Sequence, residues 1–230
     1  MAAYRLQCNG NWHYHHARKH TKICEILQLD ILEMTSDRMM KTIEPDIPYQ
    51  VSLAGREEWA LGEPQYMRKG ITWYTDGSKT PQGVGAGIHG VRPEVCLGMG
   101  KLATVFQAEV AVLRECVRLH VDRGYRGRTI FVNSDSRAAL LALASHSYTS
   151  KLVWDCHKAL KELAEYNKVI LTWVPGHEGI QGNEGADKCA KAGAATPFIG
   201  PEPVCGVAYN QVRGAVSHRV SNEHRKKWAS

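Results

Sequence analysis

Four carboxylates stand where an α/β protein could bring them together. Asp76 and Asp135 each follow a β-branched, apolar run, so they come at the ends of two predicted strands. If the two strands are neighbours, their ends coincide at the edge where open sheets bind ligands. Glu109 lies on the apolar stripe of a predicted helix, and Asp187 opens the last predicted helix. Acids that converge in this way repel one another unless cations neutralise them.

Oxygen-only ligands select Mg²⁺, with Mn²⁺ as a substitute, over zinc. The sequence therefore predicts a pair of Mg²⁺ ions held by Asp76, Glu109, Asp135 and Asp187. Two such ions, about 3.5–4 Å apart, form the usual clamp for in-line attack at a phosphodiester. Each acid also has a structural explanation: a turn residue, a surface acid, or a helix-start residue stabilised by the helix dipole.

A histidine precedes the last of these acids in a glycine-rich loop. His177 follows the apolar run 169–174, and Gly176, Gly179 and Gly182 surround it. We interpret His177 as a proton shuttle or a product-release aid, and the glycines as residues that let the loop move.

Hydrophobic periodicity predicts the elements that position these residues. Strands are predicted at 71–78, 83–90, 94–100, 128–134 and 169–174, and helices at 104–123, from 137, at 150–166 and at about 184–194. The sequence therefore favours a five-stranded mixed α/β sheet, with its first three strands antiparallel and helices on its faces. Thr104 can cap the longest helix and Gly124 can end it. The glycines of 83–90 indicate close backbone approach or bulges, because no phosphate-binding pattern is present.

The flanking segments divide the chain into three parts. We expect an extension over 1–69, a domain over 70–196 and a basic, helical tail over 197–230. Within the extension, apolar spacing predicts an amphipathic helix at 22–43. Proline and glycine predict an extended linker at 44–70.

A histidine-rich stretch near the N-terminus leaves two interpretations open. His16, His20 and Cys24 are four residues apart, which would place them on one helix face. They could contribute to a zinc site, which needs a fourth ligand. The alternative is a solvated helix or a disordered tail.

Composition bounds the class of protein. The 230 residues carry a net charge of +6, which allows a polyanionic partner without requiring one. The seven cysteines are scattered and odd in number, so we expect free thiols in a reducing compartment. Neither a secretory signal nor an apolar run of about 18 residues is present. The expected location is intracellular, cytoplasmic or nuclear, with no membrane partner.

Taken together, four motifs resemble those of type 1 ribonuclease H. They are Thr75–Ser78, Gln107–Glu109, Ser134–Ser136 and Trp173–Asp187. In that family the acids occur in the order Asp, Glu, Asp, Asp. A histidine precedes the last Asp by ten residues and an asparagine by four, a spacing that His177 and Asn183 match here. The resemblance extends over residues 71–195.

The resemblance implies a ribonuclease H-like fold, a substrate and a set of roles. The substrate would be an RNA–DNA hybrid, with the RNA strand cut to leave 5′-phosphate and 3′-hydroxyl ends. Contacts to the 2′-hydroxyl would let the protein choose the RNA strand. The implied metal ligands are Asp76, Glu109, Asp135 and Asp187, the residue that assists turnover is His177, and the substrate contacts are Gly77, Ser78 and Asn183.

A narrower resemblance is to the ribonuclease H segment of insect-type non-LTR retrotransposon polyproteins. The phrases WYTDGSK, ATVFQAEV and GPEPVCG carry it, and residues 1–69 resemble the connection that follows a reverse transcriptase. This implies a reverse transcriptase as a partner in cis or in trans. The alternative function is a catalytically weak or inactive nucleic-acid-binding module derived from such an element.

One segment departs from some cellular members of that family, which carry a basic helical protrusion. In its place, residues 145–150 are expected to form a short polar loop. The protrusion grips the hybrid electrostatically. Arg123, Arg126, Arg128 and the basic residues 225–227 could substitute for it, or could belong to a solvated turn and a solvated tail.

Overall fold

The computed structural model describes residues 31, 34–53, 55–90 and 94–229. They fall into two compact units, which are described separately. One unit is Ser36–Ala208, and the other comprises the chain ends up to Thr35 and from Tyr209. The predicted histidine–cysteine stretch lies outside the described residues.

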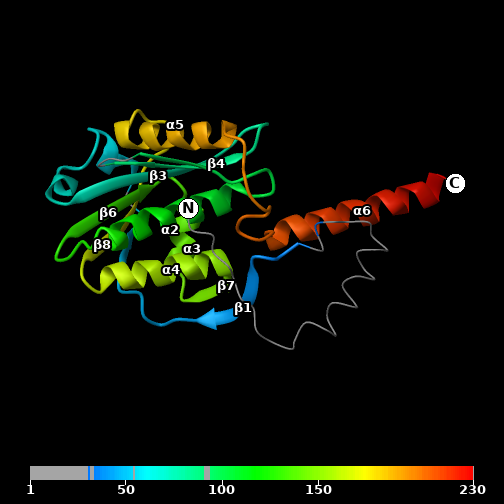
Figure 1. Cartoon of the computed structure of the whole chain (residues 1–230), viewed down its shortest axis with the longest axis horizontal. Coiled ribbons are helices and arrows are strands. Elements are labelled where there is room, and N and C mark those ends of the chain that lie inside the picture. The colour runs from blue at the N-terminus through cyan, green and yellow to red at the C-terminus, as the bar shows by residue number, and fades with distance from the viewer. Residues whose placement is uncertain (1–30, 32–33, 54, 91–93, 230) are drawn as a thin grey trace. The chain divides into compact units, whose positions relative to one another are not determined.

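A six-stranded mixed sheet forms the centre of the larger unit (Figure 1). Its strands, in spatial order, are β2 (Gln50–Ser52), β8 (Lys168–Trp173), β6 (Thr129–Ser134), β3 (Ile71–Lys79), β4 (Val84–His89) and β5 (Val95–Gly98). β3, β4 and β5 pair antiparallel, whereas β2, β8, β6 and β3 pair parallel. The five predicted strands are present, and β2 adds a sixth that the sequence did not predict.

Helices cover both faces of this sheet. Figure 1 shows α5 (Gln181–Ala195) on one face. The other face carries α2 (Val105–Asp122), α3 (Arg137–Leu143) and α4 (Lys151–Ala164). The predicted α/β class and helix order are therefore confirmed.

Glycines on β4 bring α5 into direct contact with the sheet. A Cβ atom at Gly85 would lie 2.1 Å from the Ala190 carbonyl oxygen and 2.1 Å from the Ala194 nitrogen. At Gly87 it would lie 2.2 Å from the Ala186 carbonyl oxygen. Close backbone approach is therefore the reason for the glycines in this strand.

The long helix α2 begins and ends as expected. The backbone amide of Gln107 donates to Thr104 Oγ1 over 3.1 Å. The backbone amide of Thr104 donates to Gln107 Oε1 over 3.1 Å, and the two bonds together form a capping box. Gly124 follows the C-cap with a φ of 66°. Of the predicted apolar stripe, Val105 is 40% exposed because it lies in the first turn, before the helix reaches the core.

Two predictions about local structure were wrong. Residues Arg38–Ile43, which were assigned to a helix, form strand β1. It pairs antiparallel with β7 (Ser147–Ser150), which occupies the segment predicted as a polar loop. Apolar spacing in so short a stretch does not separate helix from strand, and the strand is fixed by long-range pairing and by Tyr148, which is buried.

The segment predicted as an extended linker packs on the sheet. It contains β2 and two 3₁₀ helices, η2 (Arg56–Trp59) and η3 (Gln65–Lys69). Trp59 and Met67 are buried. The compact unit consequently starts at Ser36, well before the expected boundary at Gly70.

The remaining predictions concern the tail and the cysteines. Helix α6 (Tyr209–Ala229) confirms a helical tail. Within the described residues, no helix is long and apolar enough to cross a membrane. Cys96, Cys116, Cys156, Cys189 and Cys205 are free thiols, whereas the first two cysteines of the sequence lie outside the described residues.

The close contact between β4 and α5 predicts that Gly85→Ala is destabilising. The added methyl group would overlap the backbone of α5, and such overpacking costs about 1–3 kcal/mol. Urea denaturation measures the loss. Gly214→Ala is the control, because nothing lies within 4 Å of a Cβ atom there, and it should leave stability unchanged or raise it. Equal stability of the two variants would contradict the proposed contact.

Candidate active site

Strand pairing brings Asp76 and Asp135 together. β3 and β6 run parallel and stay in register up to the pair Thr75 and Ser134. The two aspartates come next on their strands, where the parallel ladder ends. β3 itself continues to Lys79 by pairing with β4. β3 therefore extends past Asp76, which the sequence placed at the end of its strand, because antiparallel pairing with β4 continues on the other side.

Helix α2 supplies the third carboxylate through a close contact. A Cβ atom at Gly77 would lie 2.9 Å from the Glu109 nitrogen, so the glycine lets the helix approach β3. Carboxylate oxygens of Asp76, Glu109 and Asp135 all lie within 4.8 Å of one another. The exposed fractions of Asp76 and Glu109 are only 6% and 4%. Glu109 Oε2 is buried and has no hydrogen-bond partner among the described residues.

The electrostatics of this cluster favour a cation. Burial raises the pKa of Asp76 to about 7, and the charges of Asp135 and Asp187 add to the shift. Burial and the charges of Asp76 and Asp135 raise the pKa of Glu109 well above its usual range. Burial also raises the pKa of Asp135, although a hydrogen bond from Asn183 opposes the shift. Unpaired acids held this close are stabilised by a divalent ion.

Asp187 belongs to a second group of possible ligands. Atoms of His177, Glu184 and Asp187 lie within 4.8 Å of one another. Lys191, one turn further along α5, contacts Asp187 Oδ2 over 2.6 Å and supplies the positive charge. Glu184 was not predicted as a ligand, although its position three residues before Asp187 places both on one helix face.

The glycines around His177 have packing reasons. A Cβ atom at Gly176 would lie 2.6 Å from Asp135 Oδ2, and one at Gly182 would lie 2.1 Å from the Tyr74 ring. Close contact therefore explains two of the three glycines that we had attributed to loop mobility. Gly179 has a φ of 73°, which a turn requires. His177 also has a positive φ, 56°, which is uncommon for a non-glycine residue.

The N-terminal segment braces the loop and the site. Trp173 Nε1 donates to the Asp135 carbonyl oxygen over 3.0 Å. In turn, Trp59 Nε1 donates to the Trp173 carbonyl oxygen over 3.1 Å. Arg56 forms an ion pair with Glu178, next to His177. These supporting residues were missed because their sequence context reads as a linker.

The predicted substrate contacts lie close to the acids. Gly77 and Ser78 are partly exposed and directly follow Asp76 on β3. Asn183 is 2% exposed and hydrogen-bonds Asp135. The roles of the three residues in substrate binding stay predictions.

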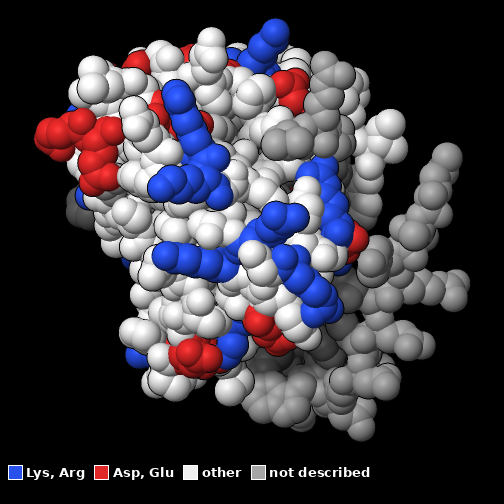
Figure 2. All heavy atoms as spheres, turned by 90° about the vertical axis from the view of Figure 1, so that its left-hand side faces the viewer, with Lys and Arg blue, Asp and Glu red and all other residues white. Residues whose placement is uncertain are grey.

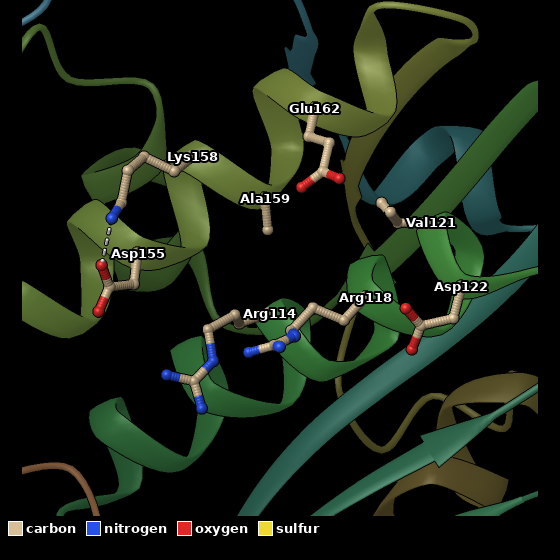
Figure 3. Close-up of a pocket in the computed structure, with 8 residues that line it drawn as sticks. All are labelled: Arg114, Arg118, Val121, Asp122, Asp155, Lys158, Ala159 and Glu162. Carbon is tan, nitrogen blue, oxygen red and sulfur yellow. Dashed lines mark ion pairs between the residues drawn. The ribbon is translucent and has the colours of Figure 1, made fainter. Parts of the chain in front are cut away.

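A hollow of about 340 Å³ between α2 and α4 is a weaker candidate (Figure 3). Its charged lining residues are Arg114, Arg118, Asp122, Asp155, Lys158 and Glu162. Lys158 is paired with Asp155 over 2.9 Å. Charges of both signs line the hollow in equal number, so it selects neither an anion nor a cation.

A family model described as RNase H matches residues 68–195. The chain belongs to the RNase H family. All four acids lie within the matched range. The resemblance to ribonuclease H and the predicted ribonuclease H-like fold are thereby confirmed, whereas the narrower resemblance to retrotransposon polyproteins stays a prediction.

Two relatives illustrate the similarity. A protein named ribonuclease H from Methylobacillus flagellatus is 34% identical over 96 residues, which cover 40% of this chain and 62% of the relative. The solved structure of RNase H1 from Halobacterium salinarum is 23% identical, with a TM-score of 0.41. That match covers 54% of this chain and 96% of the other.

The raised pKa of Asp76 predicts a pH-dependent stability in metal-free buffer. Between pH 3.8 and about 7 the folded state binds more protons at Asp76 than the unfolded state. Stability therefore falls as the pH rises through this window. Asp76→Asn should lose much of that slope and should be more stable than the parent at pH 8, by an amount on the order of 1–3 kcal/mol.

Urea denaturation at pH 5 and pH 8 checks this prediction. Asp155→Asn is the matched control. Hydrogen bonds from Lys151 and Lys158 lower the pKa of Asp155, although burial alone would raise it. The ionised carboxylate therefore stabilises the fold, and Asp155→Asn should lose stability relative to the parent as the pH rises. If the free energy of unfolding of Asp76→Asn changed with pH as steeply as that of the parent, Asp76 would not be the source of the pH dependence.

Proposed function

We propose that this chain is an endonuclease that hydrolyses the RNA strand of RNA–DNA hybrids and leaves 5′-phosphate and 3′-hydroxyl ends. One observation carries the proposal. Two buried carboxylates, of Asp76 and Glu109, and the half-buried carboxylate of Asp135 lie within 4.8 Å of one another, and Glu109 Oε2 has no hydrogen-bond partner among the described residues. Membership of the RNase H family supports the choice of substrate.

The donor set fits a pair of Mg²⁺ ions, with Mn²⁺ as a substitute. Asp76, Glu109, Asp135 and Asp187 would hold them, since all four offer carboxylate oxygens, which these hard cations prefer. Bound there, the ions supply an activated water and neutralise charge on the leaving oxygen. Lys191 is exposed, so its ammonium group can swing away from Asp187 when a cation takes its place.

Other side chains would orient the substrate and move a proton. The buried amide of Asn183 fixes the carboxylate of Asp135 by a hydrogen bond. Gly77 and Ser78 would contact the RNA strand next to Asp76. His177 lies beside Glu184 at the exposed mouth of the site, where it would take up or release a proton as product leaves.

The finer origin of the chain is also a proposal. The phrases shared with insect-type non-LTR polyproteins support derivation from such an element, with a reverse transcriptase as partner in cis or in trans. The rival proposal is an inactive module that only binds nucleic acid. It does not explain why all four acids are present. Hybrid binding without cleavage in Mg²⁺ or Mn²⁺ would favour that rival.

Removal of one metal ligand should abolish cleavage. With a labelled RNA–DNA hybrid and Mg²⁺, Asp135→Asn should cleave at least about 100-fold more slowly than the parent, since loss of even an outer-shell partner costs about 10–100-fold. Asp155→Asn, which removes an acid on α4, should cleave at the parent rate. Equal cleavage by the parent and by Asp135→Asn would sink the proposal.

Loss of His177 should slow turnover and leave metal binding intact. His177→Ala should lower the steady-state rate about 100-fold, the lower end of the range of about 10²–10⁴-fold for acid–base groups. The Mg²⁺-induced rise in melting temperature should match that of the parent. His218→Ala, in α6, is the control. A lost melting-temperature response in His177→Ala would instead make the histidine a metal ligand.

A further inference from the structure

Positive side chains gather where the parallel strands begin. Lys69 ends η3 just before β3, Arg128 precedes β6, and Lys168 opens β8. The Lys168 amide donates to the Arg128 carbonyl oxygen over 2.8 Å, which places the two residues side by side. This end of the sheet is on the left in Figure 1 and faces the viewer in Figure 2, where Lys and Arg cross the middle of the face.

Acidic neighbours do not neutralise these charges. Lys69, Arg126, Arg128 and Lys168 are exposed. None of them takes part in the ion pairs found among the described residues. In Figure 2 the Asp and Glu side chains lie mainly toward the margins of the face. Unpaired, exposed cations of this kind attract a polyanion.

Exposed aromatic rings lie among the cations. Tyr66 is 47% exposed, and its ring contacts Phe131 with the centroids 5.9 Å apart. Tyr166 is 50% exposed, and the guanidinium group of Arg126 lies 3.8 Å from its ring centroid. Rings held in place beside cations provide flat surfaces on which bases can stack.

A hollow joins these two features. It measures about 420 Å³ and is lined by Tyr66, Lys69 and Lys168, with polar groups from Gln50 and Thr172. Its volume falls in the range of small-ligand sites. An unpaired base presents its face to a ring, whereas a paired base is stacked inside a duplex. The hollow therefore suits a single strand better than a hybrid.

We propose that this end of the sheet binds single-stranded nucleic acid. A base stacks on Tyr66 in the hollow, Lys69 and Lys168 bind the flanking phosphates, and Arg126 and Arg128 continue the path. The site is separate from the carboxylates, because Ile71 and Asp76 are five residues apart on β3, about 17 Å. It goes beyond the proposed hydrolysis and needs no metal ion.

Fluorescence anisotropy with labelled oligo(dT) and oligo(rU) of about 15 nucleotides tests the proposal. The full chain is used in EDTA, which stops metal-dependent cleavage. Lys69→Gln combined with Lys168→Gln should weaken binding. The logarithm of the association constant falls with the logarithm of the salt concentration, and the steepness of this fall should decrease by about 1.4, or about 0.7 per phosphate contact. The control, Lys41→Gln with Lys101→Gln, removes the same charge from other exposed sites and should leave the slope unchanged.

Stacking is tested separately from charge. Tyr66→Ala should weaken binding about tenfold or more with the salt slope unchanged, and Tyr66→Phe should restore it. Ultraviolet cross-linking of oligo(rU) should label the peptide that contains Tyr66. Comparable binding of inorganic polyphosphate, or equal affinity of Tyr66→Ala and the parent, would overturn the proposal in favour of a general polyanion surface.

Two readouts keep this inference apart from the proposed nuclease. The Lys69 and Lys168 double variant should cleave a short hybrid at the parent rate, because neither lysine belongs to the carboxylate site. Single-strand binding that is lost in this variant while cleavage persists supports the inference. If the parent does not cleave a hybrid but binds single strands through Tyr66, the nuclease proposal fails and the inference stands. Equal affinities for oligo(dT) and oligo(rU) would show that single-strand binding depends on stacking and not on contacts to the 2′-hydroxyl group.

Discussion

Mutual repulsion among buried carboxylates is the constraint on which this structure depends. Asp76 and Glu109, which are buried, and Asp135, which is half-buried, lie within 4.8 Å of one another, an arrangement that destabilises a metal-free fold at neutral pH. Packing elsewhere has to offset that cost. Close packing occurs at two glycines: α2 approaches β3 over Gly77, and α5 approaches β4 over Gly85. The same contacts that bury apolar surface thus set the positions of the acids.

Residues before the predicted domain boundary complete this support. Trp59 hydrogen-bonds Trp173, and Trp173 hydrogen-bonds the backbone of Asp135. The indole groups thereby connect η2, β8 and the end of β6. Arg56 holds Glu178 beside the exposed histidine. The contacts of Trp59 with Trp173 and of Arg56 with Glu178 span more than a hundred residues of sequence, and that of Trp173 with Asp135 spans 38, so local propensity gives no indication of them.

The sequence predicted the structure well where the types of the candidate site residues and the local periodicity of apolar residues indicate the same element. Helix α2, its Thr104 cap and the buried Glu109 follow from spacing alone, and so do the strand that carries Asp76 and the strand that precedes Asp135. Sequence reasoning was wrong where long-range pairing decided the outcome. β1 and β7 form only against each other, and the continuation of β3 past Gly77 depends on β4. It also attributed Gly176 and Gly182 to motion, because the contacts that require them, with Asp135 and Tyr74, come from other elements.

Charge is divided between the two ends of the parallel strands. The carboxylate end repels a polyanion until cations bind, so long-range attraction has to come from another surface. Residues Ser147–Ser150 form β7, which pairs with β1, so this segment provides no basic surface. Lys69, Arg128 and Lys168 cluster at the opposite end instead. Attraction there would raise the local concentration of nucleic acid without placing further positive charge beside the acids, whose pKa values are raised by burial and by one another's charges.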